Sequence, residues 1–268
     1  MRHLLGRIRW GAIMAIQRRN LPLSGSGPIV SFTFDDFPQS ALHVGGAILK
    51  NYGVCGTFYA AMGLMDRFNG LGPQFCREDI QTLLRDGHEL GSHTFDHLSC
   101  RSAPLGCFEA DVLKGRQAVE QTTGRCRPHQ FSYPFGHVTF RAKRRIGASV
   151  SSCRGIVPGI NESPADLNLL RANSLYSWSF DLDAVDRLFQ LTEQRRGWLI
   201  FYTHDISENP SKFGCRPNEF DAVVRLASRK QLQILPVGES ILRAMALTHA
   251  HAGSHHGGRT RLSAPRAN

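Results

Sequence analysis

The chain has 268 residues, of which 41% are hydrophobic and 20% charged, enough to bury one sizeable core in a single α/β unit. Its formal net charge is +10, a balance that suits a polyanionic partner. Much of this charge lies in the end segments "MRHLLGRIRWGAIMAIQRRN" and "GGRTRLSAPRAN", and no basic stripe with interleaved aromatic residues crosses the middle, so we do not expect nucleic-acid binding.

Residues 1–27 form a basic N-terminal segment. Its apolar run "WGAIMAI" is shorter than the ~20 residues that span a membrane, and no small-residue cleavage site follows it, so we predict a cytoplasmic protein. An ordinary first helix packed on the domain is the simplest interpretation. A weak peripheral contact with the inner membrane surface stays open, because one helical stripe would carry Leu4, Leu5, Ile8, Ala12 and Ile16.

Residues 28–247 alternate between strand and helix patterns and form the predicted catalytic domain. In chain order we predict a strand at 29–34, a helix at 41–53, a strand at 56–61, a helix at 77–87, a strand at 88–94, a helix at 107–124, strands at 130–136 and 198–204, and a final strand and helix at 232–237 and 238–247. This alternation favours parallel strands with right-handed crossovers in a closed or nearly closed α/β barrel. Such barrels place their chemistry at the C-terminal ends of the strands.

The tail at residues 248–268 is basic and rich in histidine and glycine, lacks apolar periodicity, and is predicted to be disordered. The seven cysteines form no CxxC pair, so we interpret them as reduced structural thiols rather than as a zinc or redox site.

Two adjacent carboxylates, Asp35 and Asp36, end the first predicted strand in "SFTFDDF". Successive side chains of a strand point to opposite faces, so one of the two would enter the core unless both belong to a site. A turn or helix N-cap is the plainer interpretation, since a helix follows.

The stretch "GSHTFDH" places His93 and His97 four residues apart, on one face if this turn is helical. Such a pair alone is weak evidence. Two histidines and one carboxylate, here Asp36, make a common three-ligand set for a catalytic divalent metal. Asp35 is then free to act as general base on water whose pKa the metal lowers. The ligand types suit zinc, and cobalt, nickel or iron take the same geometry.

With these residues in place, the chain resembles the NodB-homology polysaccharide deacetylases, also called carbohydrate esterase family four. The resemblance runs from about residue 28 to 245 and is carried by four ordered motifs, "TFDD", "SHTFDH", "FSYPFG" and "FYTHD". It implies a distorted (β/α) barrel and metal-dependent hydrolysis of an N- or O-acetyl group on a carbohydrate, the work of a hydrolase acting on carbon–nitrogen bonds other than peptide bonds.

The resemblance also implies a role for individual residues. Asp35 would be the base, and Asp36, His93 and His97 the metal ligands. His204 would be the acid that protonates the leaving amine, because histidine exchanges protons near neutral pH. The backbone N–H of Phe135 would hold the oxyanion, and Tyr133 and Tyr202 would border the substrate.

Three departures from the family pattern bear on this prediction. Many members carry an arginine in the third motif that pairs with the base, whereas this chain has Ser132; Arg171 is our candidate substitute, because a guanidinium can hold a carboxylate bidentately. The fourth motif is not clearly present, although "LYSWSFDLD" supplies Trp178, Asp181 and Asp183. Tyr202 stands where a leucine is usual, so the acyl pocket would be less apolar.

An N-acetyl group on a polysaccharide or oligosaccharide is the predicted target. An amidase for a small non-sugar C–N bond is an alternative, since folds are reused with altered loops, and a catalytically silent glycan-binding protein is another. A long open groove would favour the polysaccharide, and a small closed cavity the metabolite. The sequence does not specify the sugar or the oligomeric state.

Overall fold

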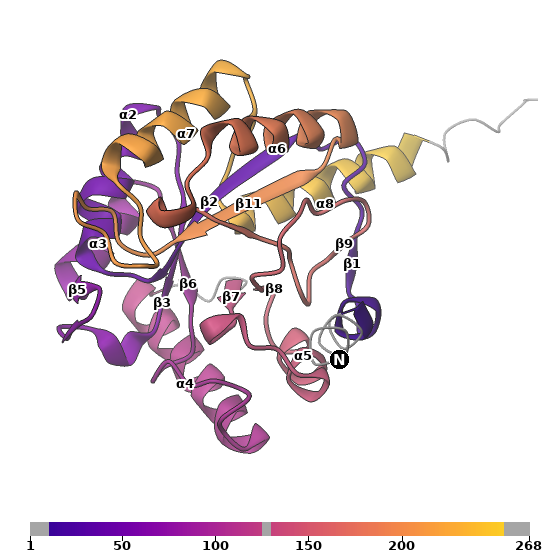
Figure 1. The fold of residues 1–268 in the computed structure, drawn as a ribbon. Helices are drawn as coiled ribbons and strands as arrows, with labels where there is room; N and C mark the ends of the chain where they lie inside the picture. The colour runs from indigo at the N-terminus through magenta and orange to yellow at the C-terminus, as the bar shows by residue number, and fades with distance from the viewer. Residues whose placement is uncertain (1–10, 125–129, 255–268) are drawn as a thin grey trace, which may run out of the picture.

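A computed structural model of the protein describes residues 11–124 and 130–254. Its centre is a parallel sheet in the order β10-β11-β2-β3-β6-β7-β8, with β12 beside β2 (Figure 1). The strands are β2 (Ile29–Asp36), β3 (Thr57–Ala60), β6 (Glu89–Ser92), β7 (Gln130–Ser132), β8 (Ser152–Arg154), β10 (Asn173–Ser174), β11 (Trp198–Thr203) and β12 (Gln233–Ile234).

Helices cover the sheet and supply the crossovers between its parallel strands. They are a π-helical turn η1 (Ala41–Gly46), α2 (Ala47–Asn51), α3 (Arg77–Arg85), α4 (Leu105–Thr123), α5 (Phe140–Gly147), α6 (Leu182–Arg195), α7 (Pro217–Arg229) and α8 (Val237–Ser254), with 3-10 turns η2 (Met62–Leu64), η3 (Pro134–Gly136) and η4 (Ser177–Ser179). Two small antiparallel pairs join β1 (Asn20–Leu21) to β9 (Ala165–Asp166), and β4 (Phe68–Asn69) to β5 (Gly72–Pro73).

The sheet is strongly curled, and its edge strands β8 and β10 do not pair with each other. Residues 155–172 cross the gap. Gly155 N–H donates to Leu170 O at 2.9 Å on the β8 side, and Asn161 N–H donates to Trp198 O at 2.9 Å on the β11 side. The fold is therefore an open half-barrel, which confirms the predicted distorted α/β barrel.

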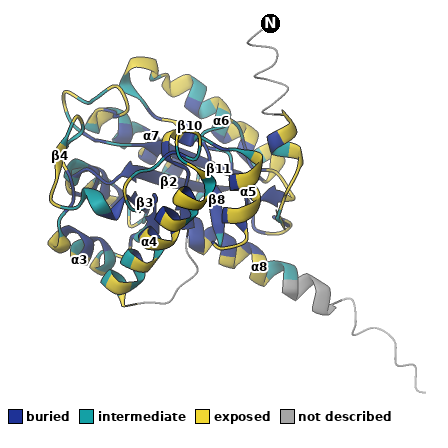
Figure 2. Cartoon of the chain, turned by 90° about the horizontal axis from the view of Figure 1, so that it is seen from below, coloured by how far each residue is buried: buried dark blue, intermediate teal, exposed yellow. Residues whose placement is uncertain are grey.

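The two faces of β2 are chemically different because side chains alternate along a strand. Phe32 and Phe34 point towards the helix layer, where each ring lies 5.5 Å from that of Phe220 in α7. Thr33 points to the opposite, inner face, where its hydroxyl donates to Phe201 O at 2.8 Å. Most residues of the sheet are buried, and the helices around it have exposed outer faces (Figure 2). Asp35 therefore leaves β2 on the inner, polar face.

The predicted elements of the domain are present. The structure adds elements that the sequence analysis did not predict: the helices α5, α6 and α7, the sheet strands β8 and β10, and the short antiparallel pairs β1–β9 and β4–β5. Helix α8 continues to Ser254, into the tail predicted to be disordered; the rest of that tail, 255–268, lies outside the described residues. None of the described cysteines forms a disulfide.

The N-terminal segment is partly ordered against the domain. Residues 11–15 are helical, with Ile13 buried and Ile16 44% exposed. The predicted stripe positions Leu4, Leu5 and Ile8 lie outside the described residues. In the part that the structure covers, no helix is both long and apolar enough to cross a membrane.

Candidate active site

The two carboxylates at the end of β2 reach one site because the backbone changes direction between them. Asp35 is the last residue with the regular alternation, and Asp36 has φ 62°. Phe37 follows with φ 64°. This left-handed conformation is uncommon for residues other than glycine, and it turns Asp36 away from the core that a regular strand would make it enter. The irregular backbone thus allows both carboxylates to reach the site, although a regular strand would place them on opposite faces.

His93 and His97 follow β6, two strands along the sheet from β2, at the same carboxyl edge. The Nε2 atoms of His93 and His97 lie 3.6 and 3.1 Å from Asp36 Oδ1. One potential ligand atom from each of the three residues lies within 4.8 Å of the others. The structure therefore brings together the three residues predicted as metal ligands.

The orientation of the two imidazoles is set by neighbouring groups. His93 Nδ1 donates to the backbone carbonyl of Ser132 at 2.8 Å, which leaves Nε2 to face Asp36. Burial lowers the pKa of His93 to about 4, so the ring is neutral at pH 7. The loop before His97 is held by Asp111 of α4, whose carboxylate accepts the Asp96 N–H at 3.1 Å. Second-layer contacts of this kind fix the direction of metal ligands.

The chemistry of this group fits a divalent cation. Asp36 Oδ1 is buried and makes no well-aligned hydrogen bond among the described residues. Burial alone would raise the pKa of Asp36, but the imidazoles of His97 and His93 outweigh it and hold the pKa well below its usual value. An ionised, under-satisfied carboxylate beside two imidazoles is the donor set of a three-ligand metal site.

Asp35 is bound by an arginine that the sequence analysis missed. The Arg154 guanidinium, fully buried at the end of β8, donates to both carboxylate oxygens of Asp35 and to Ser132 Oγ. The rings of Tyr59 and Tyr202 lie 5.3 and 5.0 Å from its Cζ atom. Burial would raise the pKa of Asp35, but Arg154 and the nearby histidines lower it, so Asp35 is ionised.

The prediction that Arg171 orients the base is therefore wrong. The Arg171 side chain donates to Pro158 O at 2.9 Å, in the segment that crosses the open side of the half-barrel. Arg154 instead takes the role because Ser132 of β7 is its register partner across the strand pair. If the short stretch "SSCRG" had been predicted as a strand, Arg154 would have been recognised as a polar residue at a strand end, and therefore as a candidate site residue.

His204 follows β11, the strand paired with β2. Its Nδ1 donates to Phe213 O at 3.3 Å, and its charge contributes to the lowered pKa of both Asp35 and Asp36. The Tyr176 and Phe213 rings lie 6.3 and 5.3 Å from its ring. The structure thus places His204 in electrostatic reach of the carboxylate pair.

The remaining predicted residues separate into two groups. Phe135 lies at the site: it has φ 59°, its ring centroid is 4.5 Å from that of His97, and its N–H donates no hydrogen bond within the described chain. Tyr202 also borders the site, 7% exposed beside Arg154. Tyr133 is different. Its side chain is 1% exposed, in the cluster that contains Phe131, so the prediction that it borders the substrate is wrong.

These observations define a class of protein: an open α/β half-barrel with a candidate divalent-metal centre, a buried carboxylate and a histidine at the carboxyl ends of its parallel strands. A family profile described as "Polysaccharide deacetylase" matches residues 24–149. Over this stretch, slightly less than half of the chain, the protein is similar to the polysaccharide deacetylase family. Arg154 and His204 both lie beyond the matched stretch.

A known deacetylase is similar to part of the chain. The chain is 27% identical over 131 residues to the peptidoglycan-N-acetylglucosamine deacetylase PgdA of Listeria monocytogenes, a match that covers 48% of this chain and only 26% of that protein.

Two solved structures share the fold. A family 4 carbohydrate esterase from Bacillus anthracis superposes with a TM-score of 0.57 at 11% identity, over 87% of this chain and 92% of that one. A family 4 acetyl xylan esterase from Clostridium thermocellum, in complex with a cobalt ion, gives 0.55 at 16% identity, over 80% and 90%.

Proposed function

We propose that the protein is a metal-dependent hydrolase that removes acetyl groups, N-acetyl groups above all, from a polysaccharide or oligosaccharide. One observation carries the proposal: Asp35 lies in a buried ion pair beside the Asp36, His93 and His97 cluster, with His204 in reach of both carboxylates. The match of residues 24–149 to the polysaccharide deacetylase profile supports the acetylated carbohydrate as substrate.

A divalent ion held by Asp36, His93 and His97 would polarise the acyl carbonyl and lower the pKa of an attacking water. Zinc is the ion we propose, and cobalt, nickel and iron fit the same two imidazoles and one carboxylate. The cobalt ion in the acetyl xylan esterase is consistent with such a choice.

Asp35 acts as general base in this proposal. Arg154 keeps the carboxylate ionised and fixes its direction, so the remaining lone pairs can accept the proton of the water that adds to the acyl carbon. The Phe135 N–H, which has no acceptor in the described chain, donates to the oxyanion that forms on the acyl oxygen.

His204 acts as general acid when the C–N bond breaks. With Nδ1 directed at Phe213 O, its Nε2 is available to give a proton to the leaving amine, so that acetate and a free amine result. Tyr202, in the position where the family has a leucine, makes one wall of the acyl pocket more polar.

The test is acetate release from a panel of N-acetylated oligosaccharides by metal-loaded protein, with Asp35→Asn beside it. Metal-dependent release that Asp35→Asn reduces by about 10³-fold or more supports the proposal. Release from small amides alone would favour the amidase alternative, and folded, metal-loaded protein that binds glycans without any release would favour the silent binding protein. The predicted cytoplasmic location, with or without peripheral membrane contact, is a separate proposal that cell fractionation tests.

A further inference from the structure

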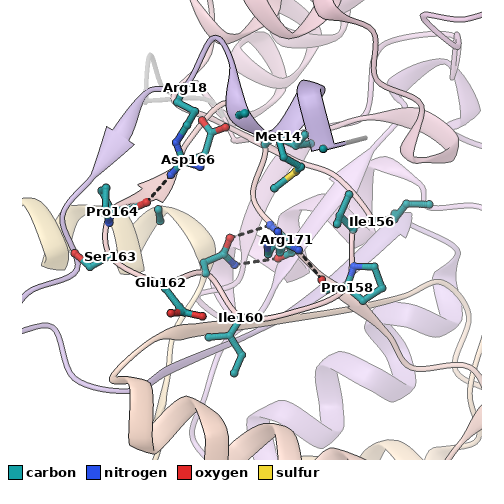
Figure 3. Close-up of a pocket in the computed structure, with 16 residues that line it drawn as sticks. Met14, Arg18, Ile156, Pro158, Ile160, Glu162, Ser163, Pro164, Asp166 and Arg171 are labelled. Carbon is teal, nitrogen blue, oxygen red and sulfur yellow. Dashed lines mark hydrogen bonds between the residues drawn. The ribbon is translucent and has the colours of Figure 1, made fainter. Parts of the chain in front are cut away.

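Apart from the candidate active site, the structure has a cavity between the N-terminal segment and the crossing segment 155–172, which we call the second cavity. Its volume is about 1160 Å³, above the ~300–1,000 Å³ of most small-molecule sites. Aliphatic groups make most of its walls: Met14 comes from the N-terminal helix, and Ile156, Pro158, Ile160 and Leu169 come from the crossing segment. Figure 3 shows Met14 and Ile160 on opposite sides of Arg171.

The cavity and the active site share a wall. Ile156 lines the cavity, and its side chain packs so closely on Gly136 that a Cβ atom there would overlap it. Gly136 follows Phe135, whose N–H faces the reacting acyl group in the proposed mechanism. Ile156 is also only two residues from Arg154, a separation of at most ~7 Å between Cα atoms. The cavity therefore borders the candidate active site at the contact between Ile156 and Gly136.

Two cationic side chains line the cavity. Arg18 and Arg171 line it, and their guanidinium groups donate to neutral oxygens: Arg18 to Pro164 O at 2.7 Å and Arg171 to Pro158 O at 2.9 Å (Figure 3). Among the described residues neither arginine forms a salt bridge.

Both acidic groups that line the cavity are already neutralised by cations. Glu162 pairs with Arg195, and Asp166 pairs with the buried Lys143 at 2.7 Å. Two uncompensated guanidiniums over aliphatic walls match an aliphatic chain with an anionic head, because guanidinium forms bidentate hydrogen bonds with phosphate.

We propose that this cavity binds the lipid part of the substrate, an aliphatic chain with a phosphate head, so that the acetylated sugar is presented to the metal cluster in lipid-linked form. The inference rests on the proposed hydrolase function for the identity of the sugar part. The binding of the lipid part is independent of catalysis and can be measured alone.

Decyl phosphate below its micelle-forming concentration is the probe, titrated calorimetrically into the full chain. We expect saturable one-site binding, and about tenfold weaker binding of decyl glucoside, which has the same chain without the charge. Ala15→Trp fills the cavity from an exposed position on its wall and should weaken decyl phosphate binding about tenfold or more. Ala12→Trp, exposed on the same helix but outside the cavity, is the matched control and should bind as the parent does. Arg18→Gln with Arg171→Gln should remove the preference for the phosphate.

Catalysis distinguishes this inference from the one that it rests on. The parent and Ala12→Trp should hydrolyse an acetylated sugar joined to decyl phosphate with about tenfold higher kcat/KM than the free sugar, and Ala15→Trp should hydrolyse both equally. Hydrolysis of free sugars without saturable decyl phosphate binding, or binding that Ala15→Trp leaves unchanged, would overturn the lipid site and spare the hydrolase. Decyl phosphate binding that Ala15→Trp weakens and Ala12→Trp does not, without acetate release from any substrate, would support the lipid site and overturn the hydrolase.

Discussion

At the scale of single residues, the site depends on an ion pair that joins two distant parts of the chain. Asp35 and Arg154 are 119 positions apart and both almost fully buried. Further hydrogen bonds to a buried carboxylate and guanidinium offset the cost of removing both charges from water. Ser132 Oγ and Gly155 O accept further guanidinium hydrogen bonds, and the rings of Tyr59 and Tyr202 flank it. We infer that Arg154 positions the base rather than contacting substrate.

Arg154→Met should therefore change the pH dependence of catalysis as well as its rate. Arg154 lowers the pKa of Asp35, so its removal should raise that pKa and move the acid limb of the kcat/KM profile to higher pH. We expect kcat to fall about 100-fold, because the base loses both its direction and its charge partner. The measurement is a pH–rate profile with metal-loaded protein. An unchanged acid limb would contradict the assignment.

The register of β7 and β8 offers a control for a variant that fails to fold. Ser132 and Arg154 are paired positions on neighbouring strands, ~4.8 Å apart in such a sheet. Exchanging them, as Ser132→Arg with Arg154→Ser, keeps the same groups in nearly the same space. The exchanged protein should recover most of the activity that Arg154→Ser alone loses.

The sequence allowed most of the site to be predicted and hid Arg154 for a physical reason. The ordered motifs at the ends of predicted strands contain Asp35, Asp36, His93, His97 and His204. Arg154 ends a three-residue strand whose other members are a serine and a cysteine, too short for an alternation to register. Only the pairing of that strand, a tertiary property, reveals that the arginine lies inside.

At the scale of elements, helix α4 supports the histidine loop. Asp111 accepts hydrogen bonds from the backbone N–H groups of Phe95 and Asp96 at 3.3 and 3.1 Å, just before His97. Gly115, one turn further, lets the helix approach so closely that a Cβ atom there would lie 2.5 Å from the Thr94 carbonyl carbon. The left-handed φ values of Thr94 and His97, 65° and 55°, are held by this contact.

Asp111→Asn should weaken metal binding without removing a ligand. The amide replaces one acceptor oxygen by an NH₂ group, which cannot accept from the loop N–H groups, so His97 loses its fixed direction. We expect the dissociation constant for zinc to rise about 10- to 100-fold, measured by competition with a chromophoric chelator. Glu109→Gln is the control, because Glu109 also lies on α4 but pairs with Arg145. Equal affinities of all three proteins would show that α4 does not support the site.

A buried histidine between α3 and β6 gives the fold an acid limit. His88 is 4% exposed, and its Nδ1 accepts the Gly56 N–H at 3.0 Å, which requires an unprotonated Nδ1. Burial lowers the pKa of His88 below its ordinary value of 6.5. As pH falls, His88 is therefore protonated in the unfolded chain before it is protonated in the folded protein. The stability that neutral His88 contributes is complete above about pH 6.5 and is lost progressively below that pH.

His88→Gln should flatten this dependence. The parent should lose up to about 1.4 kcal/mol of unfolding free energy per pH unit below pH 6.5 through this one proton, and the variant should lose less. Urea unfolding at several pH values, in chelator so that metal binding does not contribute, gives the two slopes. Parallel slopes would mean that His88 does not set the acid limit.

At the scale of the whole molecule, the alternation of strands and helices predicted the barrel, while its closure came from contacts that no local pattern encodes. The open side between β8 and β10 is crossed by residues 155–172, which have little regular structure. The N-terminal segment then pairs with this crossing through β1 and β9. Both connections depend on hydrogen bonds between residues far apart in sequence, so periodicity could not indicate them.

Lys143 connects the segments that cover the open side of the half-barrel. Its side chain is fully buried and its Nζ atom donates to Ile13 O at 2.7 Å, to Ile16 O at 2.8 Å and to Asp166 at 2.7 Å. One ammonium group thus joins the end of the N-terminal helix, α5 and β9. Arg19 N–H donates to the other Asp166 oxygen at 3.1 Å, so the same carboxylate also holds the chain that enters β1.

Lys143→Met should detach the N-terminal segment and destabilise the fold. It leaves the Asp166 carboxylate buried without its cation and two carbonyls without a donor, which costs about 3–5 kcal/mol when one partner of a buried pair is removed. Urea unfolding should show that loss, and trypsin should cut after Arg18 or Arg19 faster than in the parent, because these bonds then open locally. Lys50→Met is the control. Lys50 forms an ion pair with Asp86 at 3.0 Å near the surface, so its removal should change neither the unfolding free energy nor the rate of cleavage. If both lysine variants unfold at the same urea concentration as the parent, the buried ion pair does not close the half-barrel, and the wall of the second cavity would then depend on the β1–β9 pairing alone.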